Sequence, residues 1–185
     1  MKKLKGITLI ELLVTITVVA ILAMIGLPSF RNLILSNNVS KEVRSLQDSI
    51  ELARSNALKT GLSTIVCPAN DDASGCLDVS DWRGGWLVAV SKDGCSSNDI
   101  DDAGPIQVVG RISSESATYF PFSKVSEHNW LCFNRMGVSP KDYSGKFVFN
   151  VEGKDEYKRC VYMSGVGGVQ VLRDKETDNT DKETC

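Results

Sequence analysis

The chain has 185 residues, of which 42% are hydrophobic and 24% are charged, enough for one small domain and an additional segment. This composition excludes a disordered chain and a multi-pass membrane protein. Three of the 21 basic residues lie within residues 1–6; beyond them, 18 basic residues stand against 23 acidic ones, a net charge of −5. A domain of that sign has no general attraction to nucleic acid or anionic lipid, which excludes a polybasic binder.

Residues 7–27 form an apolar run of 21 residues with a single charge, Glu11. At about 1.5 Å per residue, the run spans a hydrocarbon core about 30 Å thick. Lys2, Lys3 and Lys5 precede it and predict a cytoplasmic N-terminus with the rest of the chain outside. The run is too long for a secretory signal peptide and ends without an A-x-A cleavage site, and no cysteine precedes position 67 for lipoprotein processing. The pattern predicts a single-pass membrane protein.

An acidic side chain inside a membrane helix costs roughly 2.5–3.5 kcal/mol on insertion scales, so it usually has a partner or a function. The residue pattern leaves two interpretations of Glu11. In one, the carboxylate reaches the lipid headgroups from near the helix end. In the other, it has a functional partner, because a buried charge is costly alone and tolerable when it is paired.

The segment Gly6–Glu11, with lysines before it and an apolar helix after it, resembles the class III leader of type IV pilins and type II secretion pseudopilins. The resemblance implies cleavage between Gly6 and Ile7 by a prepilin peptidase and methylation of the new N-terminus at Ile7. It also implies that Glu11 neutralises the terminal amine of a neighbouring subunit in a filament. Ile7 departs from the large phenylalanine usual there, but it is also bulky and apolar. The implied partners are the peptidase, the inner membrane and other pilins, which pack through their N-terminal helices.

Pro28 cannot donate a backbone hydrogen bond and predicts a kink in the continuing helix. The helix then resumes, because apolar residues recur at spacings of four and three along one face. These residues are Val39, Val43, Leu46, Ile50, Ala53 and Ala57. Gly61 follows as a C-cap. The stripe allows a coiled coil with a partner, but its length and its terminal alanines favour packing on the protein's own sheet.

Beyond Gly61 the pattern changes to short apolar runs rich in β-branched and aromatic residues, separated by turn-rich stretches. The expected strands are Ser63–Cys67, Gly85–Ser91, Ile106–Ile112, Ala117–Phe122, Trp130–Arg135, Lys146–Val151, Arg159–Met163 and Val169–Arg173. Turns are expected at Asn70–Gly75, Lys92–Pro105, Gly137–Gly145 and Ser164–Gly168. A long helix followed by antiparallel strands predicts an α+β fold in which the helix packs on the sheet.

Six cysteines lie beyond the membrane segment, and an even number in an outward-facing domain favours disulfides over metal. They are Cys67, Cys76, Cys95, Cys132, Cys160 and Cys185. The sequence does not decide their connectivity. Cys67 and Cys76 can close a short loop after the first strand, and Cys132 and Cys160 can join two strands. That choice leaves Cys95 with Cys185, which would attach the polar tail.

A narrower resemblance rests on Cys67-Pro68, Asp81-Trp82, Gly85-Trp86 and Phe133–Gly137, which look like the globular domain of the GspH/FimT/FimU group of pilins. The match is greatest to its FimU-like members. It implies a pilin fold with a leader at 1–6, a membrane and filament-core helix at 7–34, and a periplasmic α+β domain at 35–185. It also implies a minor pilin of the extracellular pilus or its tip-priming complex, supporting twitching motility.

Two alternatives within this group are a DNA receptor for natural transformation and a pseudopilin of type II secretion. DNA binding in such members uses basic residues near the C-terminal strand, whereas here Arg173 is followed by an acidic tail. The sequence predicts no enzyme, metal or cofactor. The sole histidine, His128, would need Cys132 as a catalytic partner, and a disulfide would consume that thiol. Asp71-Asp72 and Asp99–Asp102 do not fit a calcium loop, and Gly165–Gly168 does not fit a phosphate loop.

Overall fold

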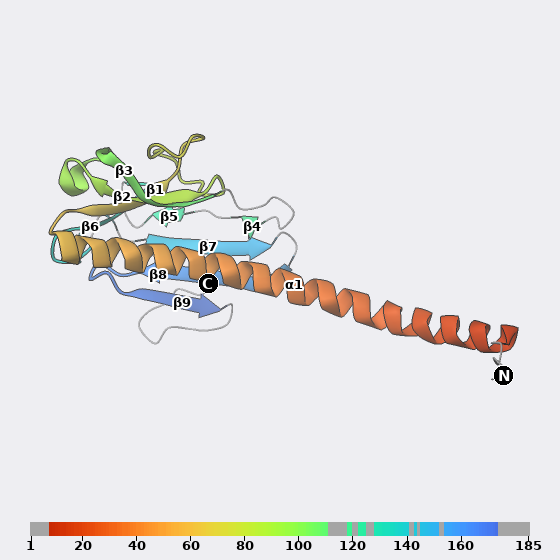
Figure 1. Ribbon diagram of the computed structural model, residues 1–185. Coiled ribbons are helices and arrows are strands. Elements are labelled where there is room, and N and C mark those ends of the chain that lie inside the picture. Colours follow the sequence, from red (N-terminus) through yellow and green to blue (C-terminus); the bar gives the residue numbers. More distant parts are fainter. Residues whose placement is uncertain are drawn as a thin grey trace. The chain divides into compact units, whose positions relative to one another are not determined.

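The computed structural model describes residues 8–110, 118–119, 122–124, 128–140, 143, 145–151 and 154–173 (Figure 1). The chain divides into two compact units, residues 1–37 and residues 38–185. Helix α1 (Leu9–Thr60) belongs to both, and all the strands belong to the second. The fold is α+β, with one long helix and two antiparallel sheets, as the sequence predicts.

In the second unit, α1 buries the apolar stripe expected from the sequence. All six of its residues are at most 4% exposed: Val39, Val43, Leu46, Ile50, Ala53 and Ala57. The stripe is therefore covered by the protein's own domain, as predicted, and not by a coiled-coil partner. Gly61 adopts a left-handed φ of 71°, and its N–H donates to the Ala57 carbonyl at 2.9 Å. This is the expected C-cap, which ends the helix before the first strand.

The first sheet has the strand order β3-β2-β1-β6. Its strands are β1 (Thr64–Pro68), β2 (Trp86–Ser91), β3 (Ile100–Val109) and β6 (Leu131–Phe133). The short 3-10 helix η1 (Gly94–Ser96) lies between β2 and β3. Strand β1 is central and almost entirely apolar, which fits burial on both faces of a sheet.

The second sheet has the order β4-β7-β8-β9, with β5 also paired to β7. Its strands are β4 (Thr118–Tyr119), β5 (Phe122–Lys124), β7 (Gly145–Val151), β8 (Lys154–Met163) and β9 (Val169–Arg173). One face carries the buried residues Phe147, Phe149, Val151, Val161 and Met163. Trp82, from the loop before β2, packs edge-on against Phe147 with ring centroids 4.8 Å apart. Trp82 thereby connects the core of the second sheet to the loop that leads into β2 of the first sheet.

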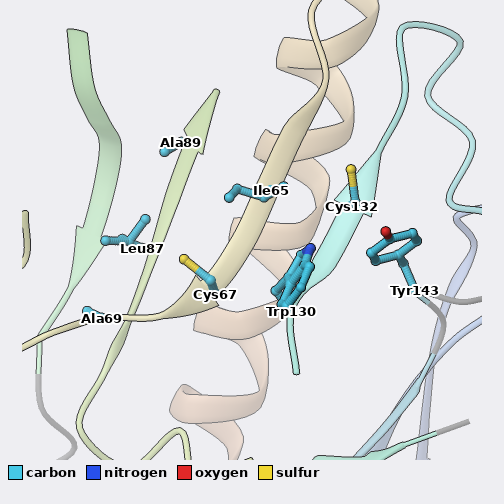
Figure 2. Packing of buried hydrophobic residues seen from close by; sticks show 8 residues of the cluster. All are labelled: Ile65, Cys67, Ala69, Leu87, Ala89, Trp130, Cys132 and Tyr143. Atoms are coloured by element: carbon cyan, nitrogen blue, oxygen red, sulfur yellow. The ribbon is translucent and has the colours of Figure 1, made fainter. Parts of the chain in front are cut away.

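The first sheet has two buried faces with different coverings. One face packs on α1, since Thr64 and Trp86 both hydrogen-bond to helix side chains. The opposite face holds a second core (Figure 2). That core comprises Ile65, Cys67, Ala69, Leu87, Ala89, Trp130, Cys132 and Tyr143, and its partly buried neighbours are Cys76, Cys95 and Ile100. Loops therefore cover this face where a helix covers the other.

A buried polar relay joins α1 to the first sheet. The Trp86 Nε1–H donates to the Ser49 hydroxyl at 2.9 Å, and that hydroxyl donates to Gln107 Oε1 at 3.0 Å. Ser49 Oγ also lies 2.9 Å from the Ser45 carbonyl oxygen. Residues of β2 and β3 thus meet at one fully buried serine of α1. Because buried polar groups are costly when unpaired, the relay fixes the position of the helix relative to the sheet.

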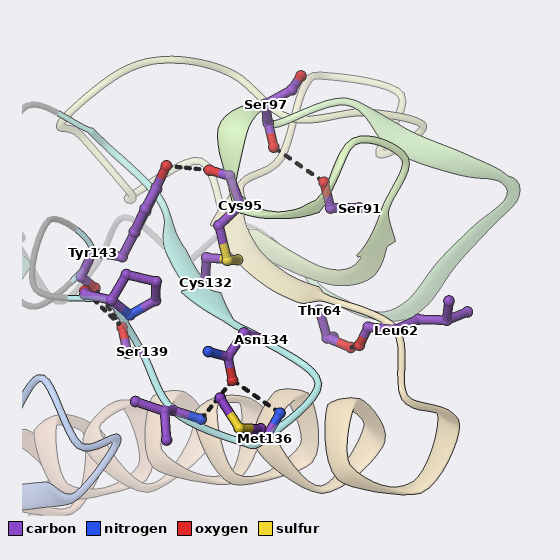
Figure 3. Close-up of a disulfide and its surroundings, with 12 residues drawn as sticks. Leu62, Thr64, Ser91, Cys95, Ser97, Cys132, Asn134, Met136, Ser139 and Tyr143 are labelled. Carbon is purple, nitrogen blue, oxygen red and sulfur yellow. Dashed lines mark hydrogen bonds between the residues drawn. A yellow bond between two sulfur atoms is a disulfide. The ribbon is translucent and has the colours of Figure 1, made fainter.

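Two disulfides are resolved, and one differs from expectation. Cys67–Cys76 closes the short loop after β1, as predicted. Cys132 is bonded to Cys95, so the expected pairs Cys132–Cys160 and Cys95–Cys185 are wrong (Figure 3). The reason is topological: β6 pairs with β1 in the first sheet, whereas Cys160 lies on β8 in the second. Cys160 is also disulfide-bonded.

Two strand boundaries also differ from expectation. Strand β3 begins at Ile100, inside the stretch Lys92–Pro105 that was expected to be a turn, and Ile100 pairs with Ser91. Strand β8 begins at Lys154, five residues before the expected Arg159. Both early segments are rich in charged residues. Strand β3 is an edge strand, and residues 154–158 of β8 precede the part of that strand that pairs with β9. Strand segments that are paired on one side only tolerate charged residues, and a search for apolar runs does not detect them.

Candidate functional site: the first turns of helix α1

Thr8 caps helix α1, and the carboxylate of Glu11 belongs to the first turn. The Glu11 N–H donates to Thr8 Oγ1 at 3.3 Å, and the Leu12 N–H donates to the Thr8 carbonyl at 3.1 Å. Thr8 and Glu11 have the spacing of a capping box, in which a threonine cap is followed three residues later by glutamate. The predicted site residues did not include Thr8, although that motif is visible in the sequence. The cap fixes the helix start, and the helix dipole favours an acidic group in this turn.

The first unit exposes its apolar side chains instead of burying them. Fifteen large apolar residues from Leu9 to Ile34 are between 42% and 77% exposed. They are Leu9, Ile10, Leu12, Leu13, Val14, Ile16, Val18, Val19, Ile21, Leu22, Met24, Ile25, Phe30, Leu33 and Ile34. Exposed apolar surface on this scale marks an interaction with other proteins or with a membrane. Of the described helices, α1 alone is long and apolar enough to cross a bilayer.

The threonine hydroxyls of this apolar stretch are satisfied within the helix. The Thr15 hydroxyl donates to the Leu12 carbonyl at 2.8 Å, and the Thr17 hydroxyl lies 2.7 Å from the Leu13 carbonyl oxygen. A hydroxyl bonded to its own helix carries little desolvation cost into an apolar environment. Among residues 8–26, Glu11 is therefore the group whose transfer remains expensive. Within the described residues, no cation forms an ion pair with it.

The other predicted site residues occupy several places. Gly6, Ile7 and Cys185 lie outside the described residues. Position 28 lies within α1, whose helical assignment continues through the proline; the kink expected at Pro28 stays a prediction. The second unit brings together Cys67 with Cys76 and Cys95 with Cys132.

His128 belongs to an aromatic group and has no free thiol beside it at Cys132, because that residue is cross-linked to Cys95. Its ring stacks on Tyr143 with centroids 4.6 Å apart and planes 5° from parallel, and it also contacts Trp130. The Tyr143 hydroxyl donates to the Cys95 carbonyl (Figure 3). The histidine therefore packs against aromatic rings, and the Cys–His alternative is not formed.

Two sequence families match the chain. The family described as "Type II transport protein GspH" covers residues 42–167, and the "Prokaryotic N-terminal methylation motif" covers residues 1–27. Comparison with curated proteins gives no match.

Two solved structures are similar in fold, both of the type IV minor pilin FimU from Pseudomonas aeruginosa PAO1. One shares 18% identity, with a TM-score of 0.57, and covers 77% of this chain and 94% of that chain. The other shares 17% identity, with a TM-score of 0.54, and covers 77% of this chain and 97% of that chain.

A capped apolar helix that continues into an α+β domain, with the FimU fold, defines a pilin-like protein. Since the GspH family covers more than half of the residues, the chain belongs to that family, and it also carries the N-terminal methylation motif. The family and the fold are those of structural pilin proteins. The resemblance to this group expected from the sequence is confirmed.

Proposed function

We propose that the chain is a minor type IV pilin, a structural and non-enzymatic subunit of a pilus or of the complex that initiates one. The observation that carries the proposal is the first unit, in which fifteen large apolar side chains are exposed around one helix and Glu11 is the only charge among residues 7–27. Such a helix needs lipid before assembly and neighbouring helices afterwards. The match to the methylation motif supports the same interpretation.

In this proposal, residues 1–6 are the leader, residues 7–34 hold the chain in the inner membrane, and residues 35–185 form a periplasmic domain. A prepilin peptidase cuts between Gly6 and Ile7 and methylates Ile7. Glu11 then pairs with the terminal amine of a neighbouring major or minor pilin. A proline at position 28 gives the helix a place to bend on assembly. The mature subunit moves from the membrane into an extracellular pilus that supports twitching.

Intact-mass measurement of the protein extracted from membranes tests the processing step. We expect the loss of residues 1–6 and one added methyl group on Ile7. Replacing Gly6 by a bulkier residue should block cleavage, because the peptidase approaches the backbone there. An unprocessed wild-type chain in cells with active pili would contradict the pilin assignment.

The second candidate is a pseudopilin of type II secretion, favoured by the family description that matches residues 42–167. A deletion strain assayed for twitching, protein secretion and DNA uptake separates the two. Loss of twitching alone supports the pilus, and loss of secretion alone supports the pseudopilin. Loss of DNA uptake with normal twitching would instead support a DNA-binding minor pilin, the alternative that the acidic balance beyond residue 6 disfavours.

A further inference from the structure

Arg31 is the only charged residue between Glu11 and Lys41. It belongs to the first unit and lies on α1 just beyond the apolar run 7–27. Its side chain is exposed, and within the described residues it forms neither an ion pair nor a side-chain hydrogen bond. No carboxylate stands within four residues of it on either side, the spacing at which a helix pairs its own charges. The first unit therefore supplies no counter-charge for this cation.

The position of Arg31 along the helix corresponds to the headgroup layer of a bilayer. Residues 7–27 account for about 30 Å, the thickness of the hydrocarbon core. Arg31 is four residues beyond that run, which is about 6 Å further along a continuous helix. Each headgroup layer is about 5–7 Å deep, since the whole bilayer measures about 40–45 Å. Because the N-terminal lysines favour the cytoplasmic side, this layer belongs to the outward-facing leaflet.

The residues around Arg31 form a short amphipathic segment, residues 29–34. Phe30, Leu33 and Ile34 follow the spacing i, i+3 and i+4 and therefore share one face of the helix. They are 61%, 55% and 42% exposed. An apolar helix face that contains phenylalanine and leucine, with a cation beside it, is typical of a segment that lies at the boundary of headgroups and acyl chains. The composition of this segment thus agrees with its calculated depth.

The chemistry of arginine selects the ligand at that depth. A guanidinium group is a planar set of N–H donors that binds a phosphate through two parallel hydrogen bonds. We propose that Arg31 binds the phosphate of a phospholipid in the outward-facing leaflet. The inference rests on the proposed function, in which residues 7–34 hold the chain in the membrane before assembly. Lipid surrounds the helix in that state, so a phosphate is the anion within reach of Arg31.

The contact fixes the depth of the helix in the membrane. Glu11 lies twenty residues before Arg31, which is about 30 Å along the helix. With Arg31 about 6 Å outside the hydrocarbon core, Glu11 lies about 6 Å inside its cytoplasmic boundary. That depth is shallow enough for the snorkelling and local bilayer thinning that lower the cost of a membrane charge. A shift of the helix toward the cytoplasm would draw Arg31 into hydrocarbon, and a shift outward would draw Glu11 toward the bilayer centre.

Solid-state NMR tests the contact directly. The full chain, labelled with ¹³C at the guanidinium carbon Cζ of its eight arginines, is reconstituted in vesicles of phosphatidylethanolamine and phosphatidylglycerol. The buffer contains no phosphate, so lipid is the only source of ³¹P. We expect ¹³C–³¹P dephasing of about one eighth of the arginine signal, because one guanidinium group of the eight lies on a phosphate.

Two variants assign the signal. Arg31→Gln should remove this dephasing, whereas Arg44→Gln should retain it. Arg44 is the matched control because it is also an exposed arginine of α1 but belongs to the second unit. Flotation with the vesicles should be equal for all three chains, since neither variant adds a charge. No dephasing in the wild-type chain, unchanged dephasing in Arg31→Gln or its loss in Arg44→Gln would overturn the inference.

A photo-cross-link supplies a second readout, of depth. In the same vesicles, p-benzoylphenylalanine introduced at Phe30 should form phospholipid adducts at the glycerol and the first acyl carbons. Arg31→Leu should move the adducts toward the ends of the acyl chains, because the charge that limits the inward shift is gone. The same lipid carbons in both chains would overturn the inference. The proposed function is judged separately by recovery of the wild-type chain in sheared pili, so either can fail while the other stands.

Discussion

The two stretches of helix α1 obey different rules although they belong to one helix. Between Leu9 and Ile34, fifteen large apolar side chains are exposed, whereas from Val39 to Ala57 six apolar residues are buried under the protein's own sheets. The second stretch is amphipathic, with polar residues on its solvent-exposed face, while residues 9–26 of the first are apolar on nearly every side. The apolar surface of the first stretch is available for lipid and for other helices.

The largest expected effect breaks the first stretch alone. Glu11→Ala removes a charge from an apolar helix, so membrane insertion should be retained or improved. Incorporation into filaments should be lost, because the proposed neighbouring amine loses its counter-charge. Recovery in sheared pili, with membrane-fraction abundance as the control, measures this. Normal recovery would show that the carboxylate reaches the headgroups instead.

A pair of leucine variants sharpens the comparison. Leu46 is fully buried in the second stretch and Leu22 is exposed in the first. Leu46→Ala should lower the free energy of unfolding of the domain by about 2–5 kcal/mol through lost burial and a cavity. Leu22→Ala should change it by less than about 0.5 kcal/mol. Denaturant unfolding of the full chain in detergent, followed by near-UV circular dichroism, measures both. Equal losses would mean that the first stretch packs on the domain.

The disulfides of the second unit should differ in how much they contribute to the free energy of unfolding. The Cys95–Cys132 bond closes a loop with a sequence separation of 37, and Cys67–Cys76 closes one of 9. In the chain-entropy account these contribute about 4 and about 2.5 kcal/mol. Cys95→Ser with Cys132→Ser should therefore lower periplasmic yield and stability more than Cys67→Ser with Cys76→Ser. Peptide mapping without reduction checks the pairing and should also join Cys160 to Cys185, the cysteine left over. Free thiols throughout would reject structural disulfides.

Ser49→Ala tests the joint between the second stretch and the first sheet. The variant leaves the Trp86 indole N–H and the Gln107 amide oxygen without their buried partner. We expect a loss of about 1–3 kcal/mol in the free energy of unfolding. Ser45→Ala is the matched control, because the backbone carbonyl of Ser45 contacts Ser49 and its side chain does not. A similar cost in both variants would indicate a general helix effect.

The smallest effect concerns an exposed pair of the second unit. The Arg83 side chain beside Asp81, 2.6 Å away, holds the pKa of that carboxyl below its ordinary value. A lowered pKa in the folded state adds stability above the unfolded pKa and loses it as pH falls through the folded pKa. Because the pair is half exposed, Asp81→Asn should cost about 0.2–1 kcal/mol at neutral pH and nothing at low pH. A cost independent of pH would point to packing instead.

The sequence predicts the periodic elements well and the long-range pairings poorly. The buried stripe, the Gly61 cap and strand β9 follow from local spacing, and each lies where the pattern places it. Cys132 finds Cys95 only because β6 joins the sheet beside β1, across a large sequence separation. Strand order of this kind depends on the whole topology. The start of β3 is difficult to predict for another reason. Strand β3 pairs with β2 on one side only, so its polar residues can face water and no apolar run marks the strand.

At the N-terminus the sequence contains a helix-capping motif that the predicted site residues did not include. Thr8 and Glu11 form a recognisable capping pattern, and the observed bond from the Glu11 N–H to Thr8 agrees with it. The membrane cost of Glu11 draws attention to that residue, while the cap that starts the helix is less conspicuous. Which subunit meets Glu11 depends on a second chain, and no pattern within one chain encodes that geometry.

The face of the first sheet that loops cover can be completed only when its disulfides form, so folding of the domain consumes an oxidant. On that side, the buried Ile65 and Leu87 are enclosed by segments that two disulfides fasten, whereas the face toward α1 is closed by noncovalent packing. Synthesis in a reducing compartment should therefore yield a half-finished domain, with its helix side formed and its outer side open to other chains. The domain should therefore complete its fold only after export to an oxidising compartment.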